Sequence, residues 1–213
     1  MMNILITDID NTIADPRERM KRSLKEINRV DVYEKTMGRF GGFRKFLNES
    51  ELDRLWKLVL SDKYLHLDVP EHTSIRVLNR LRERGVRIVY LTGRHDVNGD
   101  SMRPGTEQWL QEHKFPDPNC GDVRLMMKPS RKMDDREFKL NALRNLLEES
   151  TDLNSQDSYG IGDMPGDAFV YSQVGLKPIL IDWLGLFPRK ELLQSAPDVR
   201  LVEDWTEVEF TFT

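Results

Sequence analysis

The chain has 213 residues, of which 38% are hydrophobic and 32% are charged, a composition typical of a globular protein with one buried domain and a modest insertion. Its net charge of −4 at pH 7 argues against a protein that coats nucleic acid, although a local basic patch is compatible with it. The single cysteine, Cys120, excludes an intramolecular disulfide and a multi-cysteine zinc cluster, and it favours a cytoplasmic location.

Short apolar runs alternate with longer helix-like stretches along most of the chain, which is typical of βαβ units. Strands are predicted at residues 3–7, 86–91, 123–127, 159–161, 178–181 and 199–202. Helices are predicted at residues 72–84, 105–113, 135–149 and 165–173. Asp134 or Asp135 can cap the third helix, and Pro165 suits the first turn of the fourth. The alternation predicts an α/β fold with a doubly wound, Rossmann-like parallel sheet.

The region between the first strand and residue 72 interrupts this alternation, because it holds helix-like patches and no clear strand. Residues 15–30 and 49–60 have amphipathic patterns and flank the glycine-bearing stretch 37–43. A connection this long is expected to be structured. We therefore expect a small helical cap inserted after the first strand. The expected domains are a core of residues 1–14 and 71–213, and a cap of residues 15–70.

Two carboxylates follow the first apolar run directly, in the string Asp8-Ile9-Asp10-Asn11-Thr12. Side chains alternate in an extended chain, so Asp8 and Asp10 can face the same way, about 6–7 Å apart. Doubly wound folds bind ligands at the carboxyl ends of their strands, and two unpaired acids there require a cation or a shared proton. Alternatively, Asp10 and Asn11 only end the strand and begin a turn.

Polar residues also follow two later strands. Thr92, Gly93 and Arg94 offer a hydroxyl, a glycine that permits close backbone approach and a guanidinium that can bind an anion. A glycine turn with a surface arginine is the alternative. Asp163 lies at the end of another strand, and Asp167 lies at the start of the next helix, where a negative charge is favourable in any protein.

Two lysines are candidates for the same edge of the sheet. Lys139 lies on the predicted helix 135–149, 24 residues before Asp163. Lys128 directly follows the predicted strand 123–127, so it also lies at the ligand-binding edge. A lysine on a charged helix is usually only a solvated surface charge, and the residues alone leave the choice open.

In combination these residues resemble the four motifs of the haloacid dehalogenase superfamily, in order and over nearly the whole chain. The motifs are Asp8 to Thr12, then Thr92, then Lys139, then Gly162-Asp163 with Asp167. The resemblance implies a phosphatase in which Asp8 attacks phosphorus and forms an aspartyl phosphate. Asp10 would act as the general acid and base, and Thr92 and Lys139 would bind the phosphoryl oxygens.

The same resemblance implies a magnesium cofactor. Its ligands would be the carboxylates of Asp8 and Asp163 and the main-chain carbonyl of Asp10. Asp167 would orient Lys139 or hold a metal-bound water. The lysine-to-acid separation typical of the superfamily favours Lys139 over Lys128. Four further residues are predicted to bind substrate: Thr12, Gly93, Arg94 and Lys128, with Arg94 placed to contact a second substrate phosphate.

The segment from Thr92 to Lys139 is similar to the phosphatase half of phage-type polynucleotide kinase-phosphatases, whereas their kinase string Gly-x-x-x-x-Gly-Lys-[Ser/Thr] does not occur here. Residues 16–58 carry twelve Lys/Arg against seven Asp/Glu, and Tyr33, Phe40 and Phe43 could stack a base. We therefore expect a small phosphorylated substrate, such as a nucleotide or a short nucleic-acid end.

Three other readings stay open. The substrate could be a sugar phosphate or another small metabolite, and the twelve cations could be ordinary helix surface charges. The chain could also be a non-catalytic interaction protein on the same fold. No apolar run approaches the roughly 20 residues that span a bilayer, so no membrane partner is expected. The sequence does not indicate an oligomeric state.

Overall fold

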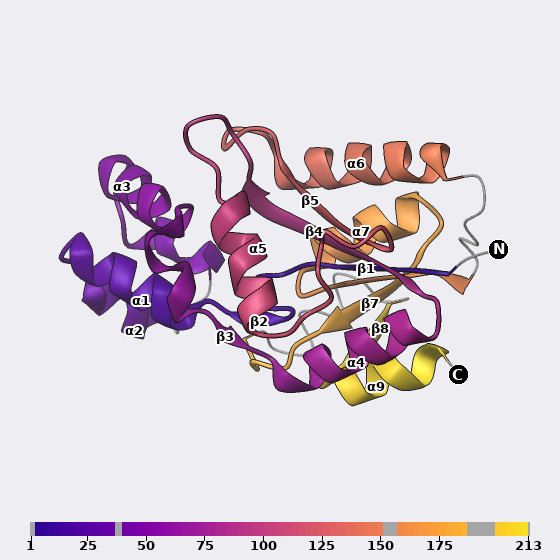
Figure 1. The fold of residues 1–213 in the computed structure, drawn as a ribbon. Helices are drawn as coiled ribbons and strands as arrows, with labels where there is room; N and C mark the ends of the chain where they lie inside the picture. Colours follow the sequence, from indigo (N-terminus) through magenta and orange to yellow (C-terminus); the bar gives the residue numbers. More distant parts are fainter. Residues whose placement is uncertain (1–2, 37–39, 151–156, 187–198, 213) are drawn as a thin grey trace.

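The computed structural model describes residues 3–36, 40–150, 157–186 and 199–212. Its centre is a six-stranded sheet in the order β5-β4-β1-β6-β7-β8, in which all neighbouring strands are parallel (Figure 1). The strands are β1 (Ile4–Thr7), β4 (Arg87–His95), β5 (Val123–Lys128), β6 (Tyr159–Gly162), β7 (Lys177–Ile181) and β8 (Arg200–Val202). The predicted doubly wound parallel sheet is confirmed.

Helices cover both faces of this sheet (Figure 1). One face carries α4 (His72–Glu83), α5 (Arg103–Glu112) and α9 (Trp205–Glu209), which is followed by η4 (Phe210–Phe212). The other face carries α6 (Asp135–Glu149) and α7 (Pro165–Gln173). Among the described residues, no helix is both long enough and apolar enough to cross a bilayer.

The central strand β1 shows why its sequence reads as a continuous apolar run. Leu5 packs into the cluster beneath α4 and α5, whereas Ile4 and Ile6 pack into the cluster beneath α6 and α7. All three side chains are fully buried, because alternate residues of a strand face opposite sides and both sides are covered. Thr7 ends the strand between β4 and β6, which places the next residue at the middle of the sheet edge.

The helix boundaries follow local signals in the sequence. The Asp134 side chain accepts hydrogen bonds from the main-chain N–H groups of Arg136 and Glu137, so Asp134, of the two predicted candidates, caps α6. Pro165 begins α7, also as predicted. Strand β4 runs four residues past its predicted end, because a register irregularity lets His95 pair with Lys128 of β5.

The segment predicted as a cap is helical and lies at one end of the sheet (Figure 1). It contains α1 (Arg17–Glu26), α2 (Val30–Thr36), η1 (Phe40–Lys45), α3 (Glu49–Val59) and η2 (Asp62–Leu67). Its two connections to the sheet form a short antiparallel pair, β2 (Ala14–Asp15) with β3 (Val69–Pro70), which the sequence did not predict. Residues 37–39 of the predicted glycine-bearing stretch lie outside the described residues.

Residues 15–70, for which we keep the name cap, contain a separate apolar cluster that includes Met20, Leu24, Leu55 and Val59. Phe43 is fully buried in this cluster, with its ring centroid 6.4 Å from that of Trp56. The prediction that Phe43 stacks a base is therefore wrong, because its ring is buried in the core of the cap and is not accessible to a substrate. The Phe40 side chain lies outside what the structure describes.

Candidate active site

The site begins at Asp8, the first residue after β1. Its main-chain N–H donates to the Ile161 carbonyl at 2.9 Å, which extends the pairing of β1 with β6 by one residue. The carboxylate accepts a hydrogen bond from the Ile9 N–H at 2.7 Å through Oδ1. Only 8% of the residue is exposed. The end of the central strand β1 thus places a carboxylate at the sheet edge, with one of its oxygens hydrogen-bonded to the main chain.

Lys139 approaches Asp8 from α6, which covers one face of the sheet. Its Nζ lies 2.8 Å from Asp8 Oδ2 and 2.6 Å from Asp167 Oδ1. Burial would lower the pKa of Lys139, but Asp167 and Asp8 outweigh it and hold the pKa well above its ordinary value. Lys139 therefore carries a positive charge between two carboxylates.

Lys128, the rival lysine, does not contact Asp8 through any described hydrogen bond. Its Nζ binds the Asp135 carboxylate and lies 3.4 Å from the Met133 carbonyl. The Asp135 carboxylate also fills the space beside Gly93, where an added Cβ would meet Oδ2 at 3.0 Å. Gly93 and Lys128 thus both lie beside Asp135, the first residue of α6.

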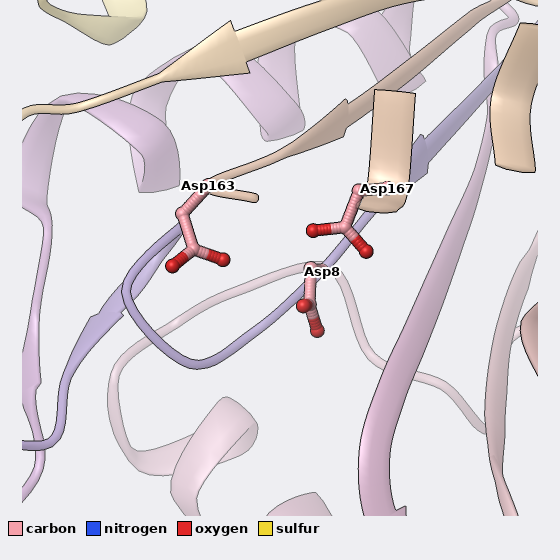
Figure 2. Close-up of side chains that lie close together, drawn as sticks. All are labelled: Asp8, Asp163 and Asp167. Carbon is pink, nitrogen blue, oxygen red and sulfur yellow. The ribbon is translucent and has the colours of Figure 1, made fainter. Parts of the chain in front are cut away.

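Three acids can reach a common point, since carboxylate oxygens of Asp8, Asp163 and Asp167 all lie within 4.8 Å of one another. Figure 2 shows the three side chains gathered beside the ends of β1 and β6 and the start of α7. Burial raises the pKa of Asp8 to about 7, with a further contribution from Asp167 and opposition from Lys139. Burial, Asp167 and Asp8 raise the pKa of Asp163 well above its ordinary value.

Asp10 does not join this cluster, because two arginines bind its carboxylate. Arg19 Nη2, from the cap helix α1, lies 2.6 Å from Asp10 Oδ1. Arg94 Nη2, at the end of β4, lies 2.7 Å from the same oxygen, and its Nε lies 3.3 Å from Oδ2. Burial would raise the pKa of Asp10, but the two guanidinium groups outweigh it and hold the pKa well below its ordinary value.

Asp68 completes this arrangement on the far side of the arginines. Its Oδ1 lies 3.0 Å from Arg19 Nε, and its Oδ2 lies 2.8 Å from Arg94 Nη2. The Asp68, Arg19 and Arg94 side chains are 0–1% exposed. We call Asp10, Arg19, Asp68 and Arg94 the arginine network. It joins the end of β1, the cap, the return from the cap and the end of β4.

The predicted substrate contact of Arg94 has to be corrected at this point. The guanidinium is fully buried and is shared between Asp10 and Asp68, so it does not present itself to a second phosphate. Thr92 is fully buried too, and its Oγ1 accepts from the Arg94 N–H at 3.2 Å. The strand register places Thr92 beside the turn after Asp8, since Tyr90 pairs with Thr7.

The turn after Asp10 is held by residues that the sequence did not single out. Trp183 Nε1 donates to the Asn11 carbonyl at 2.7 Å, and Trp205 Nε1 donates to the Thr12 carbonyl at 3.0 Å. The Thr12 side chain is fully buried, and its Oγ1 has no hydrogen-bond partner among the described residues. Trp183 follows β7 and Trp205 follows β8. Both are far from Asn11 and Thr12 in the sequence, so no local sequence pattern predicts these contacts.

The charges of the site fit a divalent cation. When all five acids of the site are ionised, the carboxylates of Asp8, Asp10, Asp68, Asp163 and Asp167 face only three cations, Arg19, Arg94 and Lys139, which leaves a formal charge of −2. Buried charge that has no partner is costly, and carboxylate oxygens are the ligands that Mg²⁺ prefers. The buried Oδ1 of Asn11 also has no hydrogen-bond partner among the described residues. The cluster of Asp8, Asp163 and Asp167 is the place where a cation would compensate this excess.

Comparison with known families identifies one match. The family described as "PITM 1-3, LNS2 domain" matches residues 57–184, about 60% of the chain. The matched region includes Thr92, Lys139, Asp163 and Asp167, and it begins after β1 and its two acids. None of the curated proteins matches this chain.

Solved structures show the same fold over nearly the full length of both chains. A haloacid dehalogenase-like family hydrolase from Streptococcus pneumoniae is 16% identical with a TM-score of 0.69, covering 100% of this chain and 99% of its own. A predicted phosphatase from Clostridium acetobutylicum is 18% identical with a TM-score of 0.67, covering 99% and 97%. A phosphoserine phosphatase, solved as an analogue of its phospho-aspartyl intermediate, is 14% identical with a TM-score of 0.61, covering 100% and 99%. These structures establish a haloacid dehalogenase-like fold.

Proposed function

The chain belongs to the family described as "PITM 1-3, LNS2 domain", and we propose that this member is a magnesium-dependent phosphomonoester hydrolase that forms an aspartyl phosphate on Asp8. One observation carries the proposal. The Asp8 carboxylate lies at the edge of the central strand, with an ammonium 2.8 Å away and two further carboxylates within 4.8 Å. The fold it shares with a phosphoserine phosphatase agrees with this assignment.

In the first step, an Asp8 oxygen bonds to phosphorus and the ester P–O bond breaks. The leaving oxygen takes a proton from Asp10. In the second step, Asp10 takes a proton from water, whose oxygen then displaces Asp8 and releases phosphate. Thr92 and Lys139 would donate to the phosphoryl oxygens, where negative charge is spread during transfer.

Arg19 and Arg94 favour the ionised form of Asp10, which is the form that accepts the proton of water. The first step requires the protonated form of Asp10, which the two arginines disfavour. The contact from Arg19 comes from the cap, so movement of residues 15–70 as a cap domain would weaken it.

Asp8, Asp163 and Asp167 would hold the Mg²⁺, together with the Asp10 carbonyl. The ion would neutralise charge on the phosphoryl group and on the acids around it. Lys139 would stay bound to Asp167, which keeps its ammonium directed at Asp8. A cytoplasmic location is part of the proposal, on the ground that the chain has a single cysteine, Cys120.

For the substrate, a nucleotide or a phosphorylated nucleic-acid end remains our proposal, in line with the resemblance to polynucleotide kinase-phosphatases. Part of the basic excess of the cap is neutralised, because Arg17, Lys21, Arg29, Lys35 and Lys57 form ion pairs with nearby acids. The exposed cations outside these ion pairs, among the described side chains of the segment, are Arg22, Lys25, Arg44, Lys45 and Arg54. Sugar phosphates are the competing class.

The test is a substrate panel run on three samples: the wild type with Mg²⁺, the wild type with EDTA, and Asp8→Asn with Mg²⁺. The panel contains an aryl phosphate, nucleoside monophosphates, 3′-phosphorylated oligonucleotides, sugar phosphates and phosphoserine. We expect turnover only in the first sample, with the highest kcat/KM on the nucleotide substrates. Turnover by Asp8→Asn would remove Asp8 as nucleophile, and full activity in EDTA would remove the metal. Sugar phosphates preferred by tenfold or more would refute the nucleotide proposal alone.

A further inference from the structure

Asn11 occupies an unusual position beside the acid cluster. Its φ of 61° is left-handed, a conformation that glycine adopts freely and that asparagine tolerates better than most residues. Its main chain is held from two sides, since its N–H donates to the Ala14 carbonyl at 2.8 Å and its carbonyl accepts from Trp183 at 2.7 Å. The backbone of this turn therefore needs a residue that tolerates positive φ, and glycine would satisfy that need.

The side chain of Asn11 does something that the backbone does not require. Its Nδ2 donates to Asp163 Oδ2 at 3.1 Å, across 152 positions of sequence. Its Oδ1 is buried and has no hydrogen-bond partner among the described residues. The residue is only 8% exposed, so bulk solvent does not satisfy this oxygen. A buried unpaired acceptor next to a carboxylate that can bind a cation calls for an explanation.

We propose that Asn11 is a positioning residue of the cation site, which holds Asp163 through Nδ2 and offers Oδ1 to a water bound to the cation. The inference rests on the proposed function, because it concerns the Mg²⁺ of that same site. The amide occupies Oδ2 of Asp163, so Oδ1 is the oxygen that is left to bind the cation. Magnesium usually keeps several of its waters, and those waters need acceptors around them.

The chain offers a matched control for removing this amide. Asn28, at the end of α1, has a nearly identical φ of 59°, but its side chain is exposed and it lies in the cap. Asn11→Gly and Asn28→Gly make the same chemical change at nearly the same φ. Only the first removes a donor to Asp163. The comparison separates loss of the amide from the general effect of placing glycine at positive φ.

The experiment titrates each purified full-length variant with Mg²⁺, and separately with Mn²⁺, in a calorimeter without substrate. Groups that orient metal ligands typically contribute about 10- to 100-fold to metal affinity. We expect Asn11→Gly to bind both ions at least tenfold more weakly than the wild type, and Asn28→Gly to bind them equally well. Equal affinity in Asn11→Gly and the wild type would overturn the inference and leave the proposed function intact. If the wild type binds neither ion, the metal of the proposed function fails first.

A second variant covers the case in which Asn11→Gly does not fold. Asn11→Asp keeps the shape and the tolerance for positive φ, but turns a donor toward Asp163 into an acceptor. We expect its metal-free form to melt below the wild type, and saturating Mg²⁺ to raise its Tm by more than it raises that of the wild type. An equal rise in both proteins would show that position 11 does not sense the cation.

Discussion

The ammonium group of Lys139 is the only described side-chain donor that contacts both Asp8 and Asp167. Lys128, at the same sheet edge, binds Asp135 instead. Loss of one preorganised donor to a developing charge commonly costs about 10²- to 10³-fold in kcat. We expect Lys139→Ala to lose at least that much kcat, and Lys128→Ala to act mainly on KM. Steady-state kinetics on one aryl phosphate checks both, and the reverse pattern would assign the phosphoryl contact to Lys128.

The raised pKa of Asp8, about 7, also predicts how stability depends on pH once metal is removed. A carboxyl whose pKa is higher in the folded state than its unfolded value of 3.8 binds its proton more tightly when folded. Its contribution to stability is therefore complete below pH 4 and is lost as the pH rises through 7. With EDTA present, we expect the Tm of the wild type to fall relative to that of Asp8→Asn between pH 5 and pH 8. A constant difference in Tm across this range would contradict the shift.

At the scale of elements, the packing of β6 against α7 sets the position of two of the three clustered acids. Gly160 of β6 faces Tyr171 of α7 so closely that an added Cβ would lie 2.1 Å from the ring. Overpacking of this kind costs about 1–3 kcal/mol, and more where the neighbour cannot move. We expect Gly160→Ala to lower the free energy of unfolding by at least that amount in urea titrations. Gly121→Ala, whose Cβ would meet open space, is the matched control and should change it by less than about 0.5 kcal/mol. Equal effects would contradict this packing.

At the scale of the whole molecule, the arginine network ties the cap to the core. Arg19→Met would leave the buried Asp68 and the partly buried Asp10 to share Arg94, and breaking a buried ion pair on one side costs about 3 kcal/mol or more. The double variant Arg19→Met/Asp68→Asn restores the balance of charge and should recover part of that loss. Arg22→Met, on the exposed side of the same helix, should have little effect. Urea unfolding measures all three, and a double variant no more stable than Arg19→Met would show that charge is not what the network balances.

Much of the fold follows from local signals in the sequence. The apolar runs predict the six strands because β1 and its neighbours are covered on both faces. The cap of α6 follows from Asp134, and the start of α7 follows from Pro165. The candidate acids Asp8 and Asp163 follow from their places at strand ends, whereas the choice of Lys139 over Lys128 rested on the superfamily resemblance. Each of the strand and helix signals depends on residues a few positions apart, so it can be recognised without knowledge of the tertiary structure.

What the tertiary structure decided are contacts between distant parts of the chain. Arg19 looks like any charged residue of a surface helix, and its burial depends on where the cap returns to the core at Asp68. The amide of Asn11 finds Asp163 only because β1 and β6 are neighbours in the sheet. The sequence allows Phe43 to face either a substrate or the core of the cap, and in the structure its ring packs against Trp56 in that core. The sequence alone determined which elements form and which chemistry ends each strand. The tertiary structure decided which charged side chains form ion pairs and which are buried. Both depend on distances between segments that are far apart in the sequence, and such distances leave no periodic signal along the chain.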